Sequence, residues 1–376
     1  MRGDPAEACS HYEHALTLYR KVGERDGTAW SLYQVAHFAS LRGEYTRART
    51  LLEESLAIRR EQGKGNKRTI TDLLFRLAEV LFLSQDEPAM VHCLLEEGLV
   101  LSREMGNKEG IANSFLLLGR VALTQGDAVT AHVWAEQSLI LYREIEERLR
   151  MRLSPAPWSY PGIARSLSFL AKVATIQEDY AAAFALYEES LTIAKVADHK
   201  WEIAFCLEGL AEVALAEGQP VQAARLCGAA EALRKANGTP IPPVYRADYE
   251  RMVTDTRKQL GEQAFAATWA QGQAMTLDQV LAAQREMSIA EPVSTISPVS
   301  QPPPPAKTSP KYPAGLTERE VEVLRLLAQG LTNAQIAEQF VLSIHTVNAH
   351  VRSIFTKINV TSRSAATRFA FEHHLV

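Results

Sequence analysis

The residues best suited to chemistry in this chain lie in "LTNAQIAEQFVLSIHTVNAHVRSIFTKI", residues 331–358. Asn, Thr, Ser, His, Arg and Lys recur there at helical spacing, and no acidic residue occurs between Glu338 and Glu372. Four basic residues stand without an acid in residues 339–371, although the whole chain has a net charge of −4. A local basic face of this kind favours contact with a polyanion.

The segment after Ser343 has two helical faces of different character. Its apolar side recurs at intervals of three and four residues, which predicts a core-facing stripe: Val347, Val351, Ile354 and Ile358. The opposite side combines donors, acceptors, a small residue and a base: His345, Asn348, Ala349, Arg352 and Thr356. In the DNA major groove, Arg matches guanine O6/N7 and Asn matches adenine N6/N7. The pattern therefore favours a DNA-reading helix over an ordinary solvated helix face.

Further polar residues extend this candidate DNA surface. The flanking residues suited to phosphate contacts are Thr346, Lys357, Thr361, Ser362 and Arg363. The preceding short helix and turn add Thr332, Asn333, Gln335 and Ser343.

Residues typical of helix caps and helix ends divide residues 315–376 into four short predicted helices. The first begins with a capping box, Thr317 and Glu320, and ends at Gly330. Thr332 caps the second, Ser343 caps the third, and Thr361 or Ser362 caps the fourth. The fourth helix carries a small apolar surface suited to a weak symmetric contact, formed by Ala365, Ala366 and Phe369.

The rest of the chain contains an internal repeat. Similar segments such as "GEYTRARTLLEESL" and "EDYAAAFALYEESL" open at positions 3, 43, 86, 126, 178 and 218. A second motif also recurs, as in "IANSFLLLGRVA" and "IAFCLEGLAEVA". Apolar spacing of three and four in both motifs predicts two amphipathic helices per unit. Because such pairs cannot bury their apolar faces alone, they must stack into an α-solenoid.

These features predict an all-α chain in four parts. Residues 1–237 form tetratricopeptide-like (TPR-like) helical repeats, interrupted by a Pro-containing loop around 152–162. Residues 238–287 form a helical capping region, and the Pro/Ser-rich residues 288–314 form an extended linker. Residues 315–376 form the four-helix DNA-binding domain. The repeat tryptophans Trp30, Trp134, Trp158 and Trp201 are expected to pack in the core, with a ligand groove as the alternative.

Composition narrows the class of protein. The four cysteines are dispersed without a CxxC pair, which favours reduced thiols. The sequence shows no secretory signal and no apolar run long enough to span a membrane, so we expect a cytoplasmic protein. It contains no GxxxxGK[ST], HExxH or GxSxG motif and no clustered metal ligands. We therefore expect no enzyme activity, no cofactor and no metal.

The segment "LTEREVEVLRLLAQGLTNAQIAEQFVLSIHTVNAHVRSIFTKINVTSRSAA" closely resembles the C-terminal helix-turn-helix of LuxR-type bacterial transcription regulators. The resemblance covers 315–376 and implies that the third helix reads DNA while the fourth contributes to dimerisation. It makes Asn348, Ala349 and Arg352 base-facing, and it makes Thr346, Lys357 and Arg363 phosphate-facing. The family commonly has Lys where this chain has Asn348, a departure that removes one positive charge from the surface.

The combination of repeats and helix-turn-helix resembles the large ATP-dependent regulators of the same family, although their nucleotide-binding module is missing here. Three functions remain open. The chain is a transcription regulator whose repeats sense a small-molecule or protein effector, a protein-interaction adaptor tethered to DNA, or an incomplete piece of an ATP-dependent regulator. We expect double-stranded DNA as a partner and a homodimer on DNA. The sequence does not identify the operator or the effector.

Overall fold

The computed structural model describes residues 5–63, 67–152, 160–280 and 312–328, with residues 282, 331, 351, 354, 357–358, 363–373 and 375. The chain divides into two compact units, residues 1–292 and 293–376, and each is considered by itself. Every regular element in these described ranges is a helix, which confirms the all-α prediction. None of the described helices is long and apolar enough to cross a bilayer.

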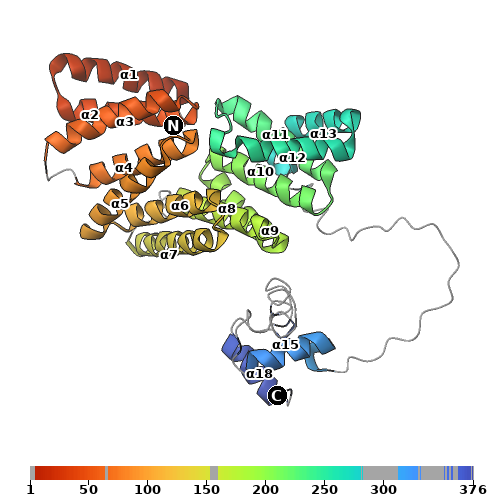
Figure 1. The fold of residues 1–376 in the computed structure, drawn as a ribbon. Helices are drawn as coiled ribbons and strands as arrows, with labels where there is room; N and C mark the ends of the chain where they lie inside the picture. Colours follow the sequence, from red (N-terminus) through yellow and green to blue (C-terminus); the bar gives the residue numbers. More distant parts are fainter. Residues whose placement is uncertain are drawn as a thin grey trace. The chain divides into compact units, whose positions relative to one another are not determined.

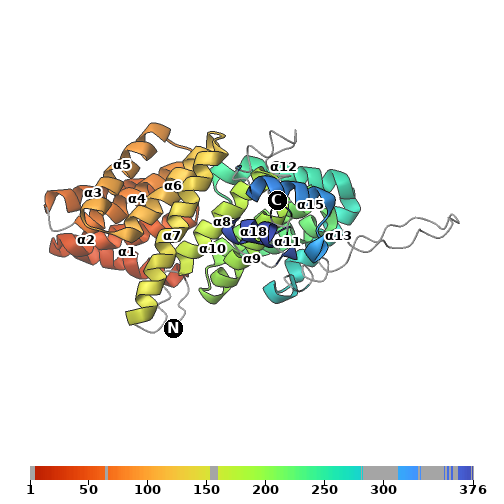
Figure 2. The same cartoon turned by 90° about the horizontal axis from the view of Figure 1, so that it is seen from below.

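The helices of the first unit follow the predicted repeat. Their bounds are α1 (Pro5–Val22), α2 (Arg25–Leu41), α3 (Tyr45–Glu61), α4 (Lys67–Ser84), α5 (Pro88–Glu104), α6 (Lys108–Thr124), α7 (Ala128–Arg152), α8 (Tyr160–Ile176), α9 (Tyr180–Val196), α10 (Lys200–Ala216), α11 (Pro220–Asn237), α12 (Pro243–Leu260) and α13 (Glu262–Ala274). Each odd-numbered helix from α1 to α11 begins close to a predicted repeat start. The helix pairs stack in chain order into a curved array, seen from two sides in Figure 1 and Figure 2.

The recurring small residues hold the repeats together. The small apolar residue five positions after each repeat start is fully or almost fully buried at Ala48, Val91, Ala131, Ala183 and Ala223. In three of these helices, α3, α7 and α9, a buried serine further along donates to a backbone carbonyl of the preceding helix. The bonds are Ser55 to Ala29, Ser138 to Ala112 and Ser190 to Ala164, each 2.8 Å long. The sequence repeat is therefore also a repeat of helix contacts.

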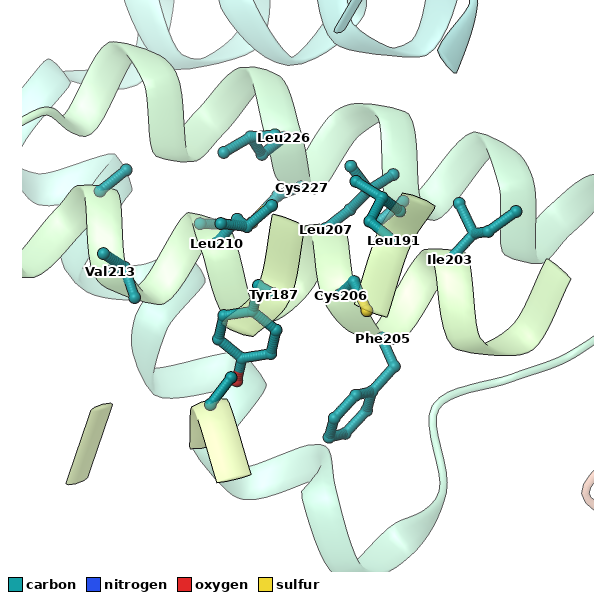
Figure 3. Close-up of a cluster of buried hydrophobic side chains, with 14 of the residues drawn as sticks. Tyr187, Leu191, Ile203, Phe205, Cys206, Leu207, Leu210, Val213, Leu226 and Cys227 are labelled. Atoms are coloured by element: carbon teal, nitrogen blue, oxygen red, sulfur yellow. The ribbon is translucent and has the colours of Figure 1, made fainter. Parts of the chain in front are cut away.

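The hydrophobic core is continuous through the later repeats. Figure 3 shows Tyr187 of α9, Leu207 and Leu210 of α10, and Leu226 of α11 converging in one buried cluster. Cys9, Cys206 and Cys227 are buried free thiols, whereas Cys93 is exposed and free. The expectation of core packing is wrong for Trp30, which is 50% exposed and stacks on Tyr33.

Residues 238–287 are predicted to cap the helical stack, but helix α12 within them does not lie at its end. Gly238 ends α11 in the left-handed conformation and three prolines follow, Pro240, Pro242 and Pro243, so the chain turns away from the direction of the stack. Helix α12 then contacts both α4 and α10. Tyr245 packs against Phe82 of α4 and Phe205 of α10, with ring centroids 6.3 and 5.6 Å apart. Helix α13 packs on α11 and caps the stack, and the buried Val280 that follows it joins the same core. We call the surface of α4, α6, α8 and α10 that faces α12 the inner groove.

Candidate nucleic-acid interface

The second unit begins with the predicted capping box. Helix α15 (Glu318–Ala328) follows a short 3-10 turn, Pro313–Gly315. The Thr317 backbone N–H donates to Glu320 Oε2 at 2.7 Å, and the Glu320 N–H donates to Thr317 Oγ1 at 3.3 Å. These reciprocal bonds satisfy two of the free N–H groups at the start of the helix. They fix the first helix of the predicted DNA-binding domain.

Three residues of the predicted apolar stripe of the third helix face the core of this unit, and the fourth, Val347, lies outside the described residues. Ile354 and Ile358 are buried and Val351 is partly buried, against α15 residues such as Leu324 and Leu327. Val351, Ile354 and Lys357 are helical. These residues place the core-facing side of the third helix where the sequence predicts it.

Most of the candidate DNA contacts lie outside the described residues. These are Thr332, Asn333, Gln335, Ser343, Thr346, Asn348, Ala349, Arg352, Thr361 and Ser362. Arg363 begins α18 (Arg363–Glu372), the predicted fourth helix. Their DNA contacts remain predictions from the sequence.

Lys357 has a partner that sequence reasoning missed. Its Nζ donates to Glu320 Oε2 at 2.8 Å, and the Glu320 side chain is only 5% exposed. The same carboxylate oxygen accepts the Thr317 N–H, so Lys357 completes the capping box. The two side chains lie 37 residues apart, and no local spacing signals their meeting. Lys357 therefore joins the third helix to the first within the domain.

The fourth helix contributes to the core of this unit. Ala366 and Ala370 are fully buried and Phe369 is partly buried in that core. Ala366 thus packs within its own domain and offers no exposed surface to a second copy. Phe371 is 56% exposed on the same helix. Arg325 Nε donates to the Leu375 carbonyl at 2.7 Å, which ties the end of the chain to α15.

We expect Lys357→Met to destabilise the second unit by about 1–2 kcal/mol. The nearly buried Glu320 carboxylate loses its cation, while partial exposure of Lys357 limits the loss. Hydrogen exchange of the α15 amides in the full chain measures the change. The same substitution in a Glu320→Gln background should cost much less, and equal costs in both backgrounds would show that the ion pair contributes nothing.

Comparisons with known protein families agree with this division of the chain. Residues 314–370 match the family described as "Bacterial regulatory proteins, luxR family". Residues 1–61 and 163–197 match tetratricopeptide repeats. The C-terminal part is therefore a LuxR-family DNA-binding domain, and TPR repeats precede it.

Individual proteins are also similar to this chain. A Mycobacterium bovis protein named as an HTH-type transcriptional regulator is 28% identical over 257 residues, covering 66% of this chain and 25% of that protein. The regulatory protein LiaR of Bacillus subtilis is 43% identical over 61 residues, covering 16% of this chain and 29% of LiaR. This chain therefore spans under a third of either relative's length. A solved structure, NprR in complex with its cognate peptide NprX, gives a TM-score of 0.49 at 17% identity, covering 77% of this chain and 78% of that chain.

Proposed function

We propose that this chain is a transcription regulator whose helical repeats receive a signal and whose C-terminal domain binds a DNA operator. The observation that carries the proposal is the combination of a LuxR-family domain at 314–370 with TPR repeats ahead of it. The capping box and the buried stripe of the third helix support the fold that this domain needs. Bacterial DNA lies in the cytoplasm, so we place this DNA-binding protein there.

In this proposal the third helix enters the DNA major groove. Asn348, Ala349 and Arg352 face base edges, and Thr346 and Arg363 contact phosphates. Few basic residues serve the surface, so a single domain binds with modest affinity. Two domains on a two-fold symmetric operator, about 34 Å apart, offset that weakness. Because Ala366 is buried, the dimer contact on α18 involves its exposed side, where Phe371 lies.

Selection of DNA from a random duplex pool by the purified full chain tests this function. We expect a two-fold symmetric site to be enriched and sedimentation to show two chains on it. Absence of any enriched sequence, or one chain on a symmetric site, would contradict the proposal.

On the selected site, Arg352→Ala should weaken binding by about 1–3 kcal/mol and relax preference at one base position. The reason is the loss of a bidentate contact that phosphate contacts do not replace. Fluorescence anisotropy on the selected site and on single-base variants measures both effects. Arg368→Ala is the matched control, because Arg368 is an exposed base on α18. If both variants lose the same binding affinity on every DNA sequence tested, Arg352 does not read a base.

A further inference from the structure

Arg120 of α6 is a buried guanidinium without an acceptor. Only 4% of the residue is exposed, and neither Nε nor Nη2 has a hydrogen-bond partner. No ion pair joins Arg120 to any acid in the described part of the chain. The buried Glu202 accepts from Ser168 Oγ through Oε1, while its Oε2 has no hydrogen-bond partner. An unpaired buried charge is costly, so its retention needs a reason.

The repeat itself marks Arg120 as an exception. The motifs "AEV", "GRV", "AKV" and "AEV" place Glu79, Arg120, Lys172 and Glu212 at corresponding positions of α4, α6, α8 and α10. Glu79 accepts hydrogen bonds from two arginines, and Lys172 Nζ donates to Glu212 at 2.6 Å. Arg120 is therefore the member of this row without a hydrogen-bonded partner, although its charge helps to lower the pKa of Glu79.

The two free nitrogens form one edge of the guanidinium. Nε–H and Nη2–H point the same way and fit the two oxygens of a carboxylate. Arg234 uses this edge in the same protein, because its Nε and Nη2 donate to the two carboxylate oxygens of Glu208, the second at 2.7 Å. Arg120 presents the same edge with no carboxylate on it.

Two aromatic rings lie close to the Arg120 guanidinium. The Arg120 Cζ lies 5.8 Å from the Phe169 ring centroid and 5.9 Å from that of Phe205. Figure 3 shows the Phe205 ring extending from α10 on the side opposite Leu226, and this ring is buried in the same cluster. Tyr245 of α12 packs against that same ring. A carboxylate reaching Arg120 would meet a water-poor site in which a charged hydrogen bond is strong.

Few side chains of helix α12 are fully buried, although Tyr245 and Tyr249 pack against the hydrophobic core. Met252 and Thr256 are its only buried residues. An open cleft of about 770 Å³ runs between α12 and the helices α8 and α10, lined by Glu212, Asp248 and Arg251 among others. Displacing α12 would expose Tyr245, Tyr249 and Met252, so an effector that moves this helix must replace their contacts with the core.

We propose that the Nε–Nη2 edge of Arg120 is the recognition point for the carboxylate of an effector, which enters the inner groove as α12 moves aside. This inference rests on the proposed function, in which the repeats receive a signal. Since α12 and α13 lead toward the DNA-binding domain in the sequence, the displaced helix is also the element that transmits the signal.

Thermal unfolding of the full chain without DNA tests the site, with sodium acetate as probe against sodium chloride at equal ionic strength. We expect acetate to raise the wild-type Tm by on the order of 5 °C at about 100 times its dissociation constant. Arg120→Met should abolish that response and raise the Tm in chloride, because it removes an unpaired buried charge. Arg120→Lys should weaken acetate binding about tenfold, because the lysine ammonium does not present two parallel N–H donors to the two carboxylate oxygens.

Lys172→Met is the matched control at the corresponding repeat position. It breaks the pair with Glu212, so it should lower the Tm while leaving the acetate response in place. An equal acetate response in wild type and Arg120→Met would overturn the proposal, as would a wild type that does not respond. A larger response to inorganic phosphate than to acetate would overturn the assignment to a carboxylate. These outcomes are independent of DNA selection, so failure here leaves the DNA-binding function standing.

Discussion

Replacing Glu79 with leucine is expected to lower the unfolding free energy of the repeat unit by about 3–5 kcal/mol. Glu79 Oε2 accepts from Arg76 Nη1 at 2.8 Å, and Oε1 accepts from Arg165 Nη2 at 2.9 Å. The Glu79 side chain is 14% exposed and that of Arg165 is 15% exposed. Removing the acid leaves two guanidiniums facing each other with poor solvation. Urea unfolding followed by tryptophan fluorescence measures the loss.

An exposed ion pair of the same kind provides the control. Arg60 of α3 donates to Glu97 of α5 at 2.7 Å, but the two side chains are 49% and 44% exposed. Glu97→Leu should therefore change stability by no more than about 1 kcal/mol. If Glu79→Leu costs as little as Glu97→Leu, the buried ion pairs do not stabilise the stack.

The same buried ion pairs predict a pH dependence. Burial by itself raises the pKa of Glu79, but the guanidiniums of Arg165 and Arg76 outweigh it and lower the pKa to about 2. Because this folded pKa lies below the unfolded value of 4.5, the stabilisation is complete above that pH and is lost as pH falls toward 2. The stability difference between wild type and Glu79→Gln should therefore shrink as the pH drops from about 5 to about 3.

Sequence reasoning predicted the elements that depend on local pattern. Capping at Thr317, the apolar stripe at Ile354 and Ile358, and the repeat starts all follow from spacing of three or four residues. Such patterns are visible in the sequence because the neighbours that they join lie on the same helix.

Contacts that depend on the curvature of the stack were not predictable. Glu79 and Arg165 lie 86 residues apart and meet only because α4 and α8 curve around the same groove. The position of Tyr245 follows from the same curvature, since it packs on Phe82 and Phe205 at once. A one-dimensional pattern gives the period of a solenoid but not the small rotation between repeats that sets its curvature.

The second large loss of stability is expected where the backbones of α11 and α13 approach each other closely. A Cβ atom at Gly272 of α13 would lie 2.0 Å from the Arg225 carbonyl oxygen of α11, and one at Gly228 would lie 2.2 Å from the Trp269 carbonyl oxygen. Both obstacles are backbone atoms, so they cannot turn aside as a side chain does. Gly272→Ala should therefore force α13 away from α11 and cost about 3 kcal/mol or more.

Trp269 of α13 can report the separation of α11 and α13. Trp269 Nε1 donates to Glu231 Oε2 at 2.7 Å, and Phe265 beside it is buried. We expect Trp269 fluorescence to shift toward that of a solvated indole in Gly272→Ala, together with a lower urea midpoint. Gly98→Ala in α5 is the matched control, because its added Cβ would lie an ordinary 3.7 Å from Leu74 Cβ. Helix propensity alone should then make Gly98→Ala neutral or more stable by up to about 1 kcal/mol. If both variants behave alike, the backbone contact between α11 and α13 does not limit stability.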